Sequence, residues 1–300
     1  MPGTIFITGA TSGFGLATAR RFARDGWTVV GTYRREHAAQ SLFDIPGVTA
    51  YELDVTDADR VQRVVDRVIA EVGVPDAIVN NAGYCLMGSL EGSSMEQIRH
   101  QLEVNFFGLV GVIKGFLPAL RERGCGTIIN VASSSAIANY PFVSVYGASK
   151  SAVAALSEAL YIELAPFGIR VKTIFPGLHA TSIFTKLESA IGPGREAYAS
   201  YFGNFAELQS RAGSGADPDQ VAVAIWNAVR RNDDRRDYVV NRDAKLLMLM
   251  RNWMPDKLWK KMNVSLISAK PSKALLAVMG WQIHGTERLD FQPDPALSTD

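Results

Sequence analysis

The alternation of short apolar runs with longer segments of helical periodicity constrains the fold of this chain most. Repeated along a chain, this pattern is typical of parallel strands joined by crossover helices. Strands are predicted at residues 4–9, 27–33, 48–54, 76–83, 126–134, 170–177 and 236–241. We therefore expect an α/β fold of the Rossmann type, a doubly wound parallel sheet of about seven strands between two layers of helices.

The same alternation runs through most of the chain, which favours a single domain over residues 1–300. Helices are predicted at 16–26, 57–72, 95–123 and 144–166. Residues 178–215 follow the sixth strand and predict a helical loop that covers the substrate. Residues 243–300 predict a helical C-terminal extension, for which packing against the domain or an oligomer partner is favoured over a place on a membrane surface.

Composition narrows the classes of protein that fit. The chain is 47% hydrophobic and 20% charged with a net charge of +1, as expected of a soluble globular protein without a nucleic-acid partner. No apolar run reaches the roughly 18 residues of a membrane span, and a strand predicted almost from the first residue argues against a signal peptide. Cys85 and Cys125 lack metal-ligand spacing and predict free thiols in a cytoplasmic protein without a metal site.

A glycine-rich turn lies between the first predicted strand and the first predicted helix. The stretch TGATSGFG places Gly9, Gly13 and Gly15 where backbone amides and a helix N-terminus attract phosphate. An ordinary tight turn is the alternative. Its position after a strand and before a helix favours a dinucleotide site.

Tyr146 and Lys150 stand four positions apart in SVYGASKSA, a stretch that predicts a helix. This spacing places both side chains on one helix face, where the cation can favour an ionised phenol. A solvated surface pair is the alternative. Ser133 ends the fifth predicted strand, so it is expected at the carboxyl edge of the sheet, where ligands bind.

Together with NNAG at 80–83 and YGASK at 146–150, the T-G-x-x-x-G-x-G spacing resembles the short-chain dehydrogenase/reductase family over about residues 4–181. The resemblance implies an oxidoreductase that uses a nicotinamide cofactor, with Ser133, Tyr146, Lys150 and Asn105 as its catalytic residues. Tyr146 would exchange a proton with the substrate oxygen, and Ser133 would hold that oxygen. Lys150 would lower the pKa of Tyr146 and bind the nicotinamide ribose. Asn105 would hold a water of a proton relay, the alternative being a hydrogen bond between helices.

The end of the second strand bears on the choice of cofactor. It carries Tyr33, Arg34 and Arg35 with no carboxylate, which favours NADP(H) over NAD(H) because Arg34 can bind a phosphate. A solvated basic turn is the alternative, and the part played by Arg35 stays open. Asp54 is expected to contact adenine or to cap its own turn, and His179 is expected to be an ordinary loop histidine. The expected cofactor-binding residues are Gly9, Thr11, Ser12, Gly13, Phe14, Gly15, Tyr33, Arg34, Asp54, Val55, Asn81, Ala82, Gly83, Tyr146, Lys150, Pro176, Gly177 and Thr181.

The expected function is therefore that of an NADP(H)-dependent carbonyl reductase or alcohol dehydrogenase. Apolar and aromatic side chains predict an apolar or aromatic substrate, with ordinary loop packing as the alternative; these are Tyr84, Cys85, Leu86, Met87, Ile183, Phe184, Leu187, Tyr198, Tyr201 and Phe202. The competing functions are a non-catalytic NADP-binding redox sensor and an NAD-dependent alcohol dehydrogenase. The resemblance also implies a homodimer or homotetramer.

Overall fold

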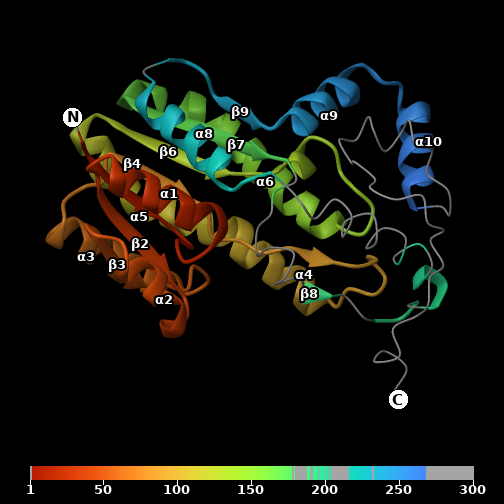
Figure 1. Ribbon diagram of the computed structural model, residues 1–300, viewed down its shortest axis with the longest axis horizontal. Coiled ribbons are helices and arrows are strands. Elements are labelled where there is room, and N and C mark those ends of the chain that lie inside the picture. The colour runs from red at the N-terminus through yellow and green to blue at the C-terminus, as the bar shows by residue number, and fades with distance from the viewer. Residues whose placement is uncertain are drawn as a thin grey trace.

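A seven-stranded parallel sheet forms the centre of the molecule in the computed structural model (Figure 1). The structure describes residues 2–177, 179, 188–189, 192–194, 196–199, 201, 203, 216–231 and 233–267. The strands are β1 (Thr4–Ile7), β2 (Thr28–Tyr33), β3 (Val48–Glu52), β4 (Ala77–Asn80), β6 (Gly126–Val131), β7 (Ile169–Pro176) and β9 (Asp237–Val240). Their order, β3-β2-β1-β4-β6-β7-β9, confirms the predicted doubly wound sheet.

Helices cover both faces of this sheet. They are α1 (Gly13–Arg24), α2 (Glu36–Phe43), α3 (Ala58–Glu71), α4 (Met95–Leu102), α5 (Gly108–Arg123), α6 (Ser144–Glu163) and α8 (Asp219–Arg230). In β1, Phe6 points into a core shared with α3, α5 and α6, whereas its neighbours Ile5 and Ile7 point into a second core shared with α1, α2 and α8. Because side chains alternate along a strand, a continuous apolar run supplies both cores.

Several element boundaries differ from the prediction. Helices α2 and α8 were not anticipated, and the strands that end at the site stop two or three residues early, at Ile7, Asn80 and Val131. Among the residues released, Thr8, Asn81 and Ser133 have polar side chains that make hydrogen bonds outside the sheet ladder. Hydrophobic periodicity marks where a strand runs but does not show where its backbone pairing stops.

The predicted helix at 95–123 forms, but it is not a regular α-helix throughout. A π-helical segment, η1 (Glu103–Phe107), separates α4 from α5. By length and composition alone Met95–Arg123 passes as a membrane span. Its Val112, Phe116 and Leu120 are instead fully buried within the core beside the sheet.

Most of the smaller elements lie beyond the carboxyl ends of the strands. The 3-10 helix η2 (Ser134–Ala136) follows β6, and β5 (Leu86–Met87) pairs in parallel with β8 (Glu188–Ser189). The 3-10 helix η3 (Ala165–Phe167) lies at the opposite edge, between α6 and the start of β7. Helices α9 (Arg242–Trp253) and α10 (Asp256–Ile267) follow β9 at the right of Figure 1. They form the described part of the predicted C-terminal extension.

Candidate active site

The glycine-rich turn after β1 is fixed by the neighbouring strand β4. Asn81 follows β4, and its side-chain amide donates to the carbonyl oxygens of Thr8 and Gly9 at 2.9 and 3.0 Å. The backbone N–H groups of Asn81 and Ala82 both donate to the Thr8 hydroxyl oxygen at 3.0 Å. The two strand ends are thus joined before any ligand binds.

The turn leaves no room for side chains at two of its glycines. Gly9 has a φ of +63°, in the left-handed region that favours glycine. A Cβ at Gly15 would collide with the carbonyl oxygen of Gly9 and lie 2.7 Å from the Asn81 amide nitrogen. Because helix α1 begins directly at this turn, its free N–H groups lie at the rim of the site. This geometry suits a pyrophosphate.

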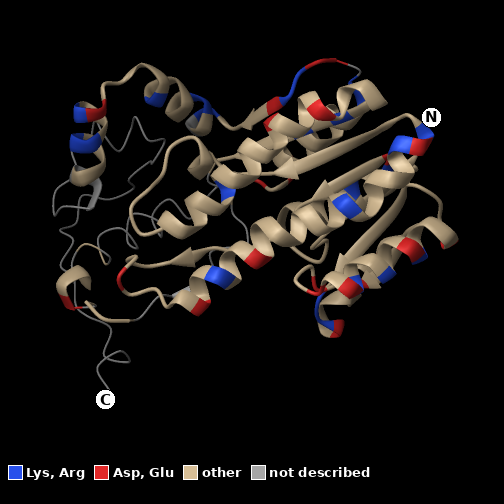
Figure 2. Cartoon of the chain, turned by 180° about the vertical axis from the view of Figure 1, so that it is seen from behind, with Lys and Arg blue, Asp and Glu red and all other residues tan. Residues whose placement is uncertain are grey.

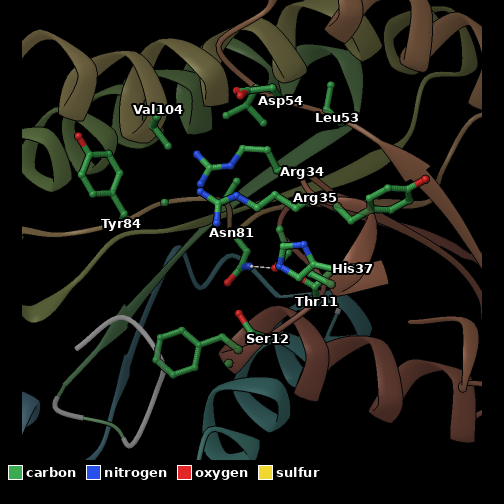
Figure 3. Close-up of a pocket in the computed structure, with 18 of the residues that line it drawn as sticks. Thr11, Ser12, Arg34, Arg35, His37, Leu53, Asp54, Asn81, Tyr84 and Val104 are labelled. Carbon is green, nitrogen blue, oxygen red and sulfur yellow. Dashed lines mark hydrogen bonds between the residues drawn. The ribbon is translucent and has the colours of Figure 1, made fainter. Parts of the chain in front are cut away.

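A cavity of about 490 Å³ opens beside the turn, and Figure 3 shows the side chains around it. It is lined by Gly9, Thr11, Ser12, Gly13, Phe14, Tyr33, Arg34, Arg35, His37, Ala38, Leu53, Asp54, Val55, Asn81, Ala82, Gly83, Tyr84, His100 and Val104. Twelve of these are among the predicted cofactor residues, and Arg35, which the sequence left open, also faces the cavity. Sequence reasoning missed His37 and His100, because a helix after β2 and the approach of α4 had to be known first.

Basic side chains gather at one end of this cavity. Arg34 and Arg35 extend side by side, with Asp54 on one side of them and Asn81 and Ser12 on the other (Figure 3). Burial raises the pKa of Asp54, but hydrogen bonds from Thr56 and the nearby charges of Arg34 and His100 outweigh it, so the pKa lies below its usual value. Asp54 thus caps its own turn and remains a charged acceptor at the cavity wall, and its contact with adenine stays a prediction.

Tyr146 and Ser133 meet at the carboxyl edge of the sheet. The Ser133 side chain is hydrogen-bonded to the phenol of Tyr146, and its oxygen also accepts the backbone N–H of Ser135 at 3.1 Å. Burial raises the pKa of Tyr146 above its usual range, while the bond to Ser133 lowers it. The side chains that were thirteen residues apart in sequence are thus direct partners.

Lys150 lies one helical turn from Tyr146 but is held by the sheet. Its ammonium donates to the carbonyl oxygen of Val131 at 2.8 Å and lies 6.0 Å from the centre of the Tyr146 ring. Burial lowers the pKa of Lys150 to about 8. The sequence predicted that Lys150 lowers the pKa of Tyr146. In this structure burial has the larger effect on that pKa and acts in the opposite direction.

Asn105 lies in the π-helical segment η1, where the regular α-helical hydrogen bonding is interrupted. Its side-chain oxygen accepts the backbone N–H of Tyr84 at 3.0 Å. Its amide donates to the Tyr84 carbonyl oxygen and to the Ser149 hydroxyl at 3.0 and 3.1 Å. Ser149 in turn donates to the backbone carbonyl of Tyr146. These bonds match the alternative role of a link between helices, and the water relay stays a prediction.

An apolar wall stands beside the Tyr146 phenol. Cys85, Met87, Phe142 and Val143 form a buried cluster against which Tyr146 packs. Phe142 has a φ of +61°, unusual for a bulky residue, and its ring meets that of Tyr198 edge to face. Burial raises the pKa of the Cys85 thiol to about 12, so this thiol is a neutral part of the wall. Cys125 is exposed, and both cysteines are free.

Other predicted positions lie at the margin of the site or outside the described residues. Pro176 ends β7 and Gly177 follows it, whereas Thr181, Ile183, Phe184, Leu187 and Phe202 are outside the described residues. His179 is more than an exposed loop histidine, since it is buried and its ring packs edge to face on Phe14 of the glycine-rich turn. Within the described part of the chain, no cluster of His, Cys, Asp and Glu forms a metal site.

Comparison with known proteins places these features in context. Residues 3–192 match the family model described as short chain dehydrogenase. The chain is 33% identical over 261 residues to a 3-ketodihydrosphingosine reductase of Bacteroides thetaiotaomicron, covering 86% of this chain and 95% of that protein. It superposes on a short-chain dehydrogenase from Streptomyces avermitilis with a TM-score of 0.77 and 32% identity, over 88% and 96% of the two chains. A 3-ketoacyl-(acyl-carrier-protein) reductase from Brucella melitensis, solved with NADH, superposes with a TM-score of 0.68 and 27% identity. The match covers 79% of this chain and 95% of that one.

Proposed function

The chain belongs to the short-chain dehydrogenase family and is an oxidoreductase, and on that premise we propose that it interconverts a carbonyl compound and an alcohol with NADP(H). The observation that carries the proposal is the convergence of Ser133, Tyr146 and Lys150 at the carboxyl edge of the sheet. A protein that only sensed a dinucleotide would not need a phenol, a hydroxyl and an ammonium assembled beside an apolar wall.

The residues around the cavity fit a nicotinamide dinucleotide. Gly9 and Gly15 permit the tight turn that brings the start of α1 to the rim of the cavity, where a pyrophosphate can bind, and Asp54 offers a charged acceptor on the wall. Arg34 and Arg35 bring two cations and no carboxylate to the end of β2, which favours the additional phosphate of NADP(H) over NAD(H). When bound, this cofactor supplies or accepts the hydride.

The protein itself handles the proton. In reduction Tyr146 donates its hydroxyl proton to the substrate oxygen as the carbonyl becomes an alkoxide, and in oxidation it removes that proton. Ser133, which shares a hydrogen bond with Tyr146, holds the same oxygen and stabilises the charge that grows on it. The positive charge of Lys150 favours the phenolate form of Tyr146. The ammonium group of Lys150 binds the nicotinamide ribose. Asn105 stabilises the π-helical segment η1 through its hydrogen bonds to Tyr84 and Ser149.

The wall of the site favours an apolar substrate. Cys85, Met87 and Phe142 present no charge next to Tyr146. Two of the compared proteins are named as reductases of 3-keto compounds, a 3-ketodihydrosphingosine reductase and a 3-ketoacyl-(acyl-carrier-protein) reductase. We therefore propose a 3-oxo compound with an apolar chain as the substrate, reduced to the 3-hydroxy product.

Substitution of Tyr146 tests the function. Tyr146→Phe removes the exchangeable proton and keeps the ring, so NADPH binding should remain while the rate of NADPH oxidation with a long-chain 3-oxo ester falls by about a hundredfold to ten-thousandfold. Tyr161→Phe, on the same helix, should leave the rate unchanged. A Tyr146→Phe enzyme with full turnover would contradict the mechanism, and a wild-type protein that binds NADPH but reduces no carbonyl would favour the sensor.

Substitution of Arg34 tests the cofactor choice. Because a guanidinium pairs with a phosphate through charge-assisted hydrogen bonds, Arg34→Ala should weaken NADPH binding by about tenfold or more and leave the Kd for NADH unchanged. Arg63→Ala, an exposed arginine of α3, is the matched control. Equal affinity of the wild type for NADH and NADPH, measured by fluorescence titration, would contradict the assignment.

A further inference from the structure

Helix α9 is apolar on both of its faces, and among the residues that the structure describes only one of these faces is covered. Ala244 and Leu247 are buried, and the helix packs beside η2, which directly follows Ser133. The opposite face presents Leu246, Leu249 and Trp253, which are 39%, 58% and 82% exposed. Their spacing of three and four residues aligns them in one stripe. An apolar stripe of this kind on the surface indicates a binding partner.

Basic side chains accompany this stripe. Residues 242–264 contain six basic and two acidic residues, in a chain whose net charge is only +1. Lys257, Lys260 and Lys261 are exposed on α10, and Figure 2 shows Lys and Arg along both helices. One of the two acids, Asp256, is already paired with Arg251 at 2.9 Å. The partner of this surface should therefore be apolar in part and negatively charged.

These two properties distinguish between the possible partners. In a two-fold dimer formed through this surface, the same net-positive patch of each copy would face that of the other, which is unfavourable. An anionic lipid surface takes both features at once, since headgroups attract lysine and the interface accepts tryptophan and leucine. The exposure of Trp253 at the turn between α9 and α10 fits the interfacial position that this residue type prefers.

We propose that α9 and α10 bind the surface of a membrane that contains anionic lipid, with the stripe Leu246, Leu249 and Trp253 in the headgroup region and the α10 lysines against the lipid charge. This position holds the end of the sheet that carries Ser133 near the bilayer. An apolar substrate could then pass from the membrane to the site without crossing water. The part that concerns the substrate rests on the proposed function, whereas the binding of the membrane does not.

Flotation of the full-length protein with lipid vesicles tests the proposal. The wild type should float with phosphatidylcholine vesicles that contain phosphatidylserine, less with phosphatidylcholine alone, and less at high salt. The double variant Leu249→Gln with Trp253→Gln should lose binding. Each of Lys257→Gln, Lys260→Gln and Lys261→Gln should weaken it by about fivefold. Ile162→Gln, an equally exposed apolar residue of α6 that is 69% exposed, is the control and should bind as the wild type does.

The outcomes separate this proposal from the others. No flotation of the wild type, or flotation that the double variant retains, would overturn it. A change in oligomeric state by light scattering, in place of a change in flotation, would overturn it in favour of an interface between copies. NADPH oxidation with a water-soluble short-chain ketone should be equal in wild type and double variant. Flotation without turnover on any ketone would count against the proposed function alone.

Discussion

At the scale of the single residue, the state of Lys150 depends on its surroundings more than on its sequence neighbours. Its ammonium is buried and bonds to the Val131 carbonyl oxygen, and burial lowers its pKa to about 8. The unfolded chain has the ordinary lysine pKa near 10.4. Below pH 8 Lys150 is charged in both the folded and the unfolded chain, and burial of this charge destabilises the folded state.

This difference predicts how stability depends on pH. Between pH 8 and the unfolded pKa the unfolded state binds more protons, so rising pH favours the folded state and relieves the cost of Lys150. Lys150→Met removes the charge. We compare the free energy of unfolding of Lys150→Met with that of the wild type. The value for the variant minus that for the wild type should be highest below pH 8 and should fall by up to about 3 kcal/mol as the pH rises above 8.

Urea unfolding of the cofactor-free protein at several pH values measures this difference. Lys114→Met, at an exposed position of α5, provides the control and should differ from the wild type by the same amount at every pH. A difference for Lys150→Met that does not change between pH 7 and pH 10 would show that Lys150 is not buried as a charged group.

At the scale of the element, two amides on successive turns of the helical run hold the segment that enters β5. Gln101 is fully buried, accepts the backbone N–H of Leu86 at 2.6 Å and donates to the Tyr84 carbonyl oxygen at 2.9 Å. Asn105 holds the N–H of Tyr84 from the next turn. Backbone groups of Tyr84 and Leu86 thus have side-chain partners, and Cys85 is fixed between them at the apolar wall.

Loss of one of these amides should loosen the wall. Gln101→Leu leaves the Leu86 N–H unpaired, which should lower the free energy of unfolding by about 1–3 kcal/mol. The KM for the carbonyl substrate should rise, with the Kd for NADPH unchanged, because Gln101 does not line the cofactor cavity. Gln62→Leu, on the exposed face of α3, is the control. Equal changes in KM and NADPH affinity would indicate general disruption of the fold instead.

At the scale of the whole molecule, two cores on opposite faces of the sheet keep the strand ends in register. Phe6 of β1 and Phe116 of α5 meet edge to face with ring centres 4.9 Å apart in one of these cores. Phe22, Trp27 and Trp226 form a similar group on the other face, joining α1 to α8. The site residues lie on loops and helices at the carboxyl edge, so their placement depends on both cores.

A cavity in one core should therefore affect stability more than chemistry. Phe116→Ala should lower the free energy of unfolding by about 3–5 kcal/mol, because a fully buried ring is lost. The Phe107 ring lies on the same helical run but is about half exposed. Phe107→Ala should therefore lower the free energy of unfolding by less than about 1 kcal/mol, as is usual for surface substitutions. Thermal unfolding followed by circular dichroism measures both, and a loss of similar size in the two variants would contradict the assigned core.

The sequence by itself determined the sheet and most of the cofactor cavity. Strand periodicity is local, and the glycine-rich turn, Asn81 and Arg34 each lie near the carboxyl end of a strand that could be predicted, although two of these strands stop earlier than predicted. Side chains at the ends of parallel strands meet at one edge, so their convergence follows from the topology.

Only the tertiary structure decided which partners the polar and charged groups have. Lys150 bonds to a strand carbonyl, Asn105 links two helices, and His179 is buried against Phe14. The exposed stripe on α9 was also decided by the tertiary structure. The sequence of α9 is apolar on both faces, and only the packing of the helix determines which face is exposed. Hydrogen bonds and burial depend on neighbours distant in sequence, which no local pattern specifies.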